Sequence, residues 1–91
     1  MRQIKVYTLK LHAEPQGLRM PRRARVLHVN HIPRLEIELY AEVDEDHVTK
    51  AFDTNQHERM FLVLSANLSV PEGAGLVGAD RGKLVYETGR S

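Results

Sequence analysis

Hydrophobic and polar residues alternate with a period of two along much of this chain. The alternation is clearest over residues 34–44, RLEIELYAEVD, where the apolar positions are Leu35, Ile37, Leu39, Ala41 and Val43. Successive side chains of a β-strand point to opposite faces of the sheet, so this segment is expected to be a strand with one buried face. Strict alternation is uncommon in parallel sheets, which are covered on both sides, and it therefore indicates an antiparallel sheet.

Shorter segments of the same kind predict further strands at residues 3–11, 24–31, 48–53, 60–64, 75–79 and 83–88. The run MFLVL at 60–64 is apolar throughout, which is typical of a central strand buried on both faces. Within 3–11 the apolar residues change face, so we expect either a bulge or a strand that is covered on both sides at one end. Loops are expected at 13–23 and 54–58, a charged turn at 44–46, and a tight hairpin at 80–82.

The pattern predicts an all-β fold, a small antiparallel sandwich or half-open barrel of six to seven short strands. A chain of 91 residues with 42% hydrophobic residues is long enough for one core, so residues 1–91 are interpreted as a single β domain. The residues expected in the core are Leu35, Ile37, Leu39, Val43, Phe61, Val63 and Val85. Glu36, Glu38 and Glu42 are expected on the opposite, wetter face of their strand.

Charge is distributed unevenly along the chain although the net charge is only +1. Residues 1–33 contain seven Lys and Arg and one acid, Glu14, whereas residues 34–58 contain eight acids and two bases. Such asymmetry can mark a surface for a partner. It can equally mean that basic and acidic strands lie side by side and neutralise each other across the sheet.

The composition excludes several kinds of site. The chain has no cysteine, which excludes disulfides, thiolate metal ligands and a cysteine nucleophile. The five histidines lack a metal-ligand spacing, and His28 and His31 are expected on opposite faces of one strand. Serine lacks a nucleophile-elbow context and glycine lacks a phosphate-loop context. We therefore expect neither an enzyme nor a bound cofactor or metal.

The hydropathy pattern predicts neither a signal peptide nor a membrane span. The opening MRQIKVYTLK is interrupted by polar residues, so we expect no cleaved signal peptide. We also find no apolar run of about 18 residues, so no membrane span is expected.

An arginine cluster is the best candidate for a binding surface. The segment RMPRRAR places four guanidinium groups within seven residues, and the candidate partner-binding residues are Arg19, Met20, Arg22, Arg23 and Arg25. Arginine suits interfaces because its planar group makes several directed hydrogen bonds, and Met20 could supply an apolar anchor. Two other interpretations stay open: the arginines pair with the acidic strand of the same chain, or they hold phosphates.

Several short motifs occur in an order that resembles a family of small bacteriophage and prophage proteins of unknown function. They are Ile4-Lys-Val-Tyr7, Met20-Pro21 with Ala24, Val26-Leu-His-Val29, Phe61-Leu-Val63, Val70-Pro-Glu-Gly73, Val77-Gly78 and Leu84-Val-Tyr86. The sequence differs from the family pattern at Arg23, where a glycine is usual. It also differs at residues 65–67, in place of Gly-Thr-Gly, and near residues 87–88, in place of a late histidine.

The resemblance implies a phage setting inside the host bacterial cytoplasm. With no catalytic pattern, the leading hypothesis is an accessory protein that binds and modulates a host protein, of the host-takeover or anti-defence type. The alternatives are a binder of a small anionic ligand such as a signalling nucleotide, and a nucleic-acid-binding protein. Nucleic acid is less favoured because aromatic residues, which stack on bases, make up only 5% of the chain. Unpaired strand edges lead us to expect a homo-oligomer.

Overall fold

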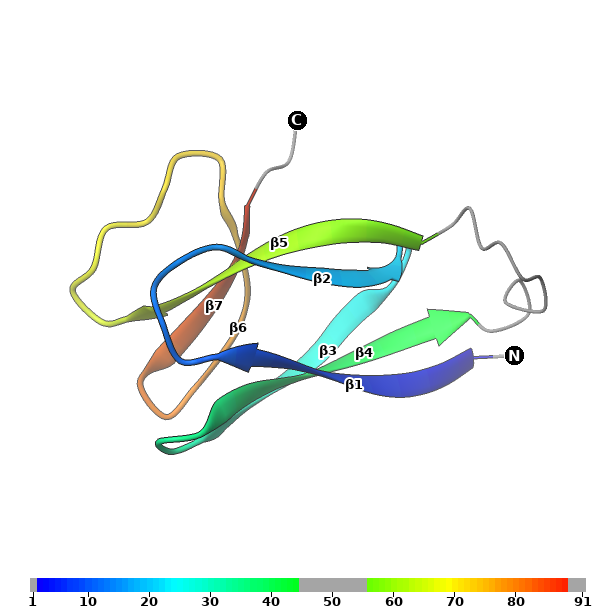
Figure 1. The fold of residues 1–91 in the computed structure, drawn as a ribbon, viewed down its shortest axis with the longest axis horizontal. Coiled ribbons are helices and arrows are strands. Elements are labelled where there is room, and N and C mark those ends of the chain that lie inside the picture. Colours follow the sequence, from blue (N-terminus) through cyan, green and yellow to red (C-terminus); the bar gives the residue numbers. More distant parts are fainter. Residues whose placement is uncertain (1, 45–55, 89–91) are drawn as a thin grey trace.

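The computed structural model describes residues 2–44 and 56–88. These ranges contain seven strands: β1 (Arg2–Lys10), β2 (Gln16–Pro21), β3 (Arg25–Ile32), β4 (Glu36–Asp44), β5 (Gln56–Ser65), β6 (Gly75–Asp80) and β7 (Lys83–Thr88) (Figure 1). The all-β prediction is confirmed. Within the described ranges there is no helix long and apolar enough to cross a membrane. The strand expected at 48–53 and most of the charged turn at 44–46 lie outside the described residues.

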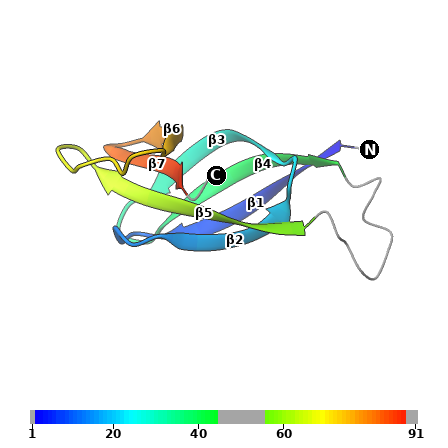
Figure 2. The same cartoon turned by 90° about the horizontal axis from the view of Figure 1, so that it is seen from above.

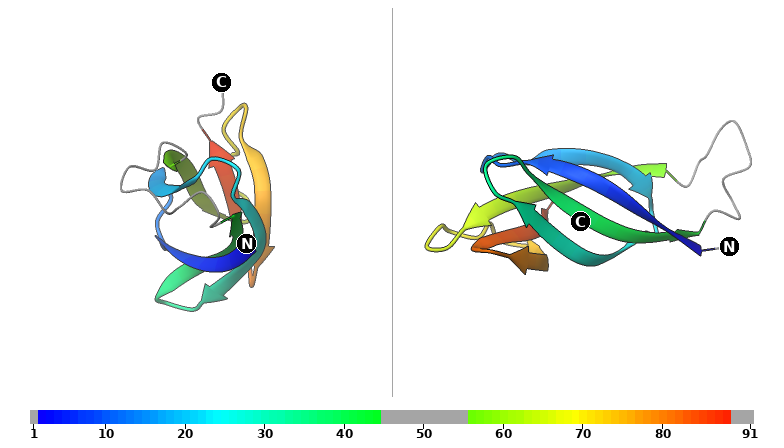
Figure 3. Two further views of the ribbon diagram at one scale, coloured as in Figure 1. Left: turned by 90° about the vertical axis from the view of Figure 1, so that its right-hand side faces the viewer. Right: turned by 90° about the horizontal axis from the view of Figure 1, so that it is seen from below.

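The strands form two antiparallel sheets. One has the order β1-β4-β3 and the other has the order β2-β5-β7-β6. Seen end-on, the strands surround a common interior (Figure 3, left), but the two sheets share no hydrogen-bonded strand pair and the barrel stays open. The predicted antiparallel sandwich or half-open barrel is therefore confirmed.

The core lies between the two sheets and is built by the alternation of each strand. Its fully buried members include Leu9, Met20, Ile37, Leu39, Val43, Phe61 and Val85. Six of the seven predicted core residues are buried, and Glu36, Glu38 and Glu42 lie on the opposite, partly exposed face of β4. Residues 61–64 of the MFLVL run are buried on both faces, because Leu62 and Leu64 are only 4% and 5% exposed, whereas Met60 is partly exposed.

Leu35 is the wrong member of the predicted core, since 65% of its surface is exposed. It lies in the turn between β3 and β4, which a hydrogen bond from its N–H to the Ile32 carbonyl closes at 3.1 Å. Pro33 and Arg34 occupy the middle of this turn, and Arg34 has a φ of 66°. The alternation of β4 begins only after the turn, at Glu36.

The loop predicted over 13–23 is wrong in its second half, because Gln16–Pro21 forms β2. Leu18 and Met20 face the core in alternation with Gly17 and Arg19. This alternation is short and includes a glycine and a proline, which are typical of turns. The sequence pattern therefore indicated a loop in place of a strand. Pro21 is tolerated because β2 is an edge strand and Pro21 is its last residue. The loop predicted over 54–58 is likewise too long, as β5 begins at Gln56.

β1 has a continuous register with β4, so the bulge, one of the two alternatives expected for this strand, is absent from it. The described bulges lie instead in β3, at Leu27, and in β6, at Val77. Leu9 faces the core, whereas Ile4 and Val6 face away from it and are 61% and 48% exposed. The change of face in the sequence thus marks a strand whose first half carries apolar side chains on the outside.

The two sheets approach closely along β3 and β6, which lie side by side in Figure 2. The His31 N–H donates to Asp80 Oδ2 at 2.7 Å, and the His31 Nδ1 is 3.3 Å from the Arg81 carbonyl oxygen. Next to them, Gly78 packs so tightly on Val29 that no side chain would fit there. Gly78 therefore lets β3 and β6 approach closely, and the Asp80 carboxylate links the two strands through the His31 N–H.

Candidate binding surface

The turn between β2 and β3 presents two arginines at its tip. It spans Pro21 to Ala24, and the Ala24 N–H donates to the Pro21 carbonyl at 3.0 Å. Ala24 is buried in the core, whereas Arg22 and Arg23 are exposed. The local sequence therefore places both guanidinium groups in solvent.

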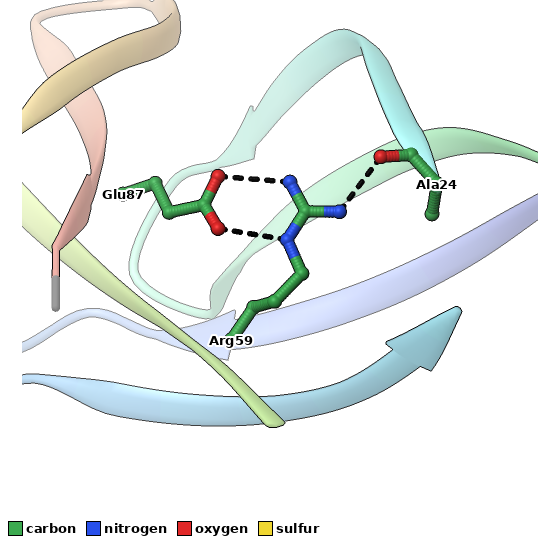
Figure 4. Close-up of polar contacts among 3 residues, drawn as sticks. All are labelled: Ala24, Arg59 and Glu87. Carbon is green, nitrogen blue, oxygen red and sulfur yellow. Dashed lines mark hydrogen bonds and ion pairs between the residues drawn. The ribbon is translucent and has the colours of Figure 1, made fainter. Parts of the chain in front are cut away.

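A buried ion pair holds this turn from the inside. Arg59 on β5 donates from Nε to Glu87 Oε2 at 2.7 Å and from Nη2 to Glu87 Oε1 at 2.8 Å (Figure 4). Its remaining nitrogen, Nη1, donates to the Ala24 carbonyl at 2.7 Å. One guanidinium group thus joins β5, β7 and the end of the arginine turn.

Burial strengthens this ion pair. The side chains of Arg59 and Glu87 are only 13% and 11% exposed, so the pair is little screened by water. The guanidinium carbon of Arg59 also lies 5.7 Å from the centre of the Phe61 ring, within the range of a cation–π contact. Bidentate pairing fixes both the distance and the plane of the two groups.

Sequence reasoning missed Arg59 and Glu87, although their positions carried a signal. Arg59 has the same parity as Phe61 and Val63, and Glu87 has the same parity as Val85. Both charges are therefore aligned with the inward face of their strands. Two opposite charges that face one core are expected to pair, because an isolated buried charge is very unfavourable.

The structure separates the predicted binding residues rather than gathering them into one patch. Arg22 and Arg23 are adjacent at the turn tip. Arg19 alternates with core-facing residues of β2, and Arg25 with those of β3, so each points outward from a different sheet. Met20 is fully buried, so its predicted role as an exposed anchor is wrong. It faces inward because it alternates with Arg19 on β2.

The expectation that basic and acidic strands lie side by side is confirmed for β1 with β4, for β3 with β4, and for β2 with β5, where Arg19 lies opposite Glu58. In the register, Lys10 lies opposite Glu36, and Arg2 Nη1 lies 3.8 Å from Glu42 Oε1. Arg25 is directly opposite Glu42 on the other side of β4. Within residues 2–44 and 56–88, none of the four arginines at positions 19–25 makes an ion pair or a side-chain hydrogen bond. Arg22 and Arg23 lie in the turn outside the strand pairing, so their charges are available to a partner.

A polar cluster separate from the arginine turn lies on the outer face of the β1-β4-β3 sheet. The rings of His28 and Tyr40 lie 5.7 Å apart and are tilted by 53°. Glu38 Oε1 accepts hydrogen bonds from the Tyr40 hydroxyl and from Asn30 Nδ2, both at 3.1 Å. The hydrogen bond to Glu38, together with its negative charge, raises the pKa of Tyr40 above its ordinary value of 10.0.

The histidines that the structure describes do not come together in a metal site. His28 faces outward beside Tyr40 and His31 faces the core side of β3, as predicted for residues three apart on a strand. His57 is exposed on β5, and the predicted candidate His47 lies outside the described residues. In the described part of the chain, no group of three His, Asp or Glu side chains lies close enough to hold an ion.

Comparison with protein-family models, with curated proteins and with solved structures finds no match to this chain. The resemblance to a phage family that the sequence suggests therefore stays a prediction.

Proposed function

We propose that this chain is a non-enzymatic binding module, a phage accessory protein that contacts an acidic surface of a host protein through Arg22 and Arg23. The observation that supports this is the combination of two exposed guanidinium groups without an internal partner and a turn held by Arg59. A preorganised turn loses little conformational entropy on binding, which favours affinity. Arginines in such a position are frequent hot spots of protein interfaces.

An acidic protein surface fits this turn better than nucleic acid does. Binding along a phosphate backbone needs an extended basic footprint. Here the outward-facing Arg25 lies opposite Glu42, and two further acids, Glu36 and Glu38, line the same face of β4. These carboxylates would repel phosphates that approach the sheet, whereas a small acidic patch on a protein could contact the turn alone.

The test is affinity capture from host lysate with wild-type protein and with the double variant Arg22→Glu/Arg23→Glu. A matched control is Arg34→Glu, which reverses the charge of an exposed arginine at the other end of β3. We expect the double variant to lose a specific partner, with at least about tenfold weaker binding in titrations of that purified partner. The control should retain it, and both proteins should keep a cooperative thermal transition.

Three results would overturn the proposal. In the first, the double variant melts many degrees lower while still capturing the same partner, which would make the arginines structural. In the second, a salt-titrated gel shift shows nucleic-acid binding whose affinity falls steeply with salt. In the third, mass spectrometry of the denatured protein finds a retained nucleotide that the double variant lacks.

A further inference from the structure

One edge of the β1-β4-β3 sheet is open along the first half of β1. β1 pairs with β4 on one side only. On the other side, the amide of Gln16 closes the end of the strand: the Lys10 N–H donates to Gln16 Oε1, and Gln16 Nε2 donates to the Lys10 carbonyl, both at 2.7 Å. From this junction β1 and β2 run apart (Figure 1).

The contact with Gln16 reveals which backbone groups face the open edge. In an antiparallel strand the N–H and C=O of one residue point to the same side, and successive residues alternate. Since both groups of Lys10 point away from β4 and the register has no shift, the groups of Thr8, Val6 and Ile4 also point away from it. Within the described residues these three make no hydrogen bond on that side.

The outward side chains at this edge have a defined pattern. Along the outer face of β1, the order is Arg2, Ile4, Val6, Thr8 and Lys10, a cation at each end with apolar residues between them. Ile4 and Val6 are 61% and 48% exposed. A partner strand that covers both would bury apolar surface in addition to forming main-chain hydrogen bonds.

A second copy of the chain fits this edge poorly in the register that pairs the whole length of β1. If β1 paired antiparallel with β1 of a second copy about a two-fold axis at Val6, Arg2 would lie opposite Lys10 of the second copy. Like charges directly opposite each other in a sheet are destabilising. The native neighbour β4 shows the opposite arrangement, with Glu36 opposite Lys10 and Glu42 3.8 Å from Arg2.

We propose that the open edge of β1 binds an extended segment of a partner protein as an added antiparallel strand. The segment has an acidic residue at each end, facing Arg2 and Lys10, and β-branched apolar residues at the alternate positions that face Ile4 and Val6. This site is separate from the arginine turn, and it stands whether or not Arg22 and Arg23 bind a host protein.

The test uses the full-length ¹⁵N-labelled protein and a capped peptide as long as β1. The peptide has glutamate at both ends, threonine, valine and isoleucine at the alternate inner positions, and serine or threonine elsewhere. We expect saturable shifts and slowed amide exchange at Ile4, Val6 and Thr8 at concentrations below about 1 mM. A peptide with lysine in place of both glutamates should bind at least about tenfold more weakly. Equal binding of both peptides, or shifts confined to β2 or β6, would overturn the proposal.

Two variants separate edge binding from folding. Val6→Pro removes one outward N–H and, in this register, no hydrogen bond to β4, so the spectrum should stay folded while peptide binding falls at least about tenfold. If Val6→Pro does not fold, the double variant Arg2→Glu/Lys10→Glu tests the proposal instead. It should bind the lysine-ended peptide more tightly than the glutamate-ended peptide, the reverse of the wild-type preference. Unchanged preference would refute the proposal, as would light scattering that shows a dimer whose β1 amides are already protected.

Discussion

Arg59 on β5 and Glu87 on β7 form a bidentate ion pair, at 2.7 and 2.8 Å, that is largely removed from solvent. The third guanidinium nitrogen extends from this pair to the Ala24 carbonyl. A charged group at the edge of an apolar core therefore determines where the β2–β3 turn lies. The stability of the fold and the presentation of Arg22 and Arg23 are coupled through this one side chain.

Removing one partner of this pair should be strongly destabilising. Arg59→Met leaves the carboxylate of Glu87 without its guanidinium partner, and we expect the free energy of unfolding in urea to fall by about 3–5 kcal/mol. Replacing both residues, as Arg59→Met/Glu87→Leu, should be less destabilising than the sum of the two single changes, because both charges of the buried pair are then removed together. Additive effects of the two single changes would show that the residues do not act as a pair.

Gly78 should tolerate no side chain, whereas Gly75 should. A methyl group at Gly78 would overlap the side chain of Val29, with its Cβ 3.2 Å from that of Val29, where the two sheets meet. We expect Gly78→Ala to lower the free energy of unfolding by about 1–3 kcal/mol through overpacking. Gly75→Ala is the matched control on the same strand, since nothing lies within 4 Å of its added carbon. Equal stability of the two variants would contradict close packing of β6 on β3.

Arg34 should be replaceable by glycine with a gain in stability. Its φ of 66° lies in the left-handed region, which disfavours L-residues by about 1–2 kcal/mol, and glycine avoids this strain. The gain is reduced by the greater flexibility of glycine in the unfolded chain, so we expect a net increase of up to about 1 kcal/mol in chemical denaturation. A loss of stability would mean that the Arg34 side chain contributes more than its backbone strain.

Tyr40 should titrate above the ordinary range of tyrosine. The raised pKa, caused by the hydrogen bond to Glu38 and by its charge, means that this interaction contributes to stability below pH 10. That contribution is lost as the pH rises through the pKa of the folded state. In ultraviolet titrations at 295 nm, Glu38→Gln should lower the pKa of one tyrosine, which Tyr40→Phe identifies. Glu36→Gln is the matched control, because Glu36 lies two residues from Glu38 on the same face of β4. It should leave the titration of Tyr40 unchanged.

Local alternation was sufficient to predict most of the strands and six of the seven expected core residues. Ile37, Leu39 and Val43 could be assigned because the face on which a strand residue lies depends only on its parity along the chain. The exceptions occur where turn geometry interrupts that parity. Leu35 belongs to the turn with Pro33, and Met20 belongs to a short strand whose glycine and proline resemble loop signals.

The pairing of distant segments was decided only by the tertiary structure. Parity could place Arg59 and Glu87 on inward faces, but only the register of β5 with β7 brings them together and directs the third nitrogen to Ala24. The open edge of β1 was equally beyond the sequence, since a strand has two edges and the sheet order determines which is free. Side-chain direction is a local property of a strand, whereas its neighbours depend on residues far away in the chain.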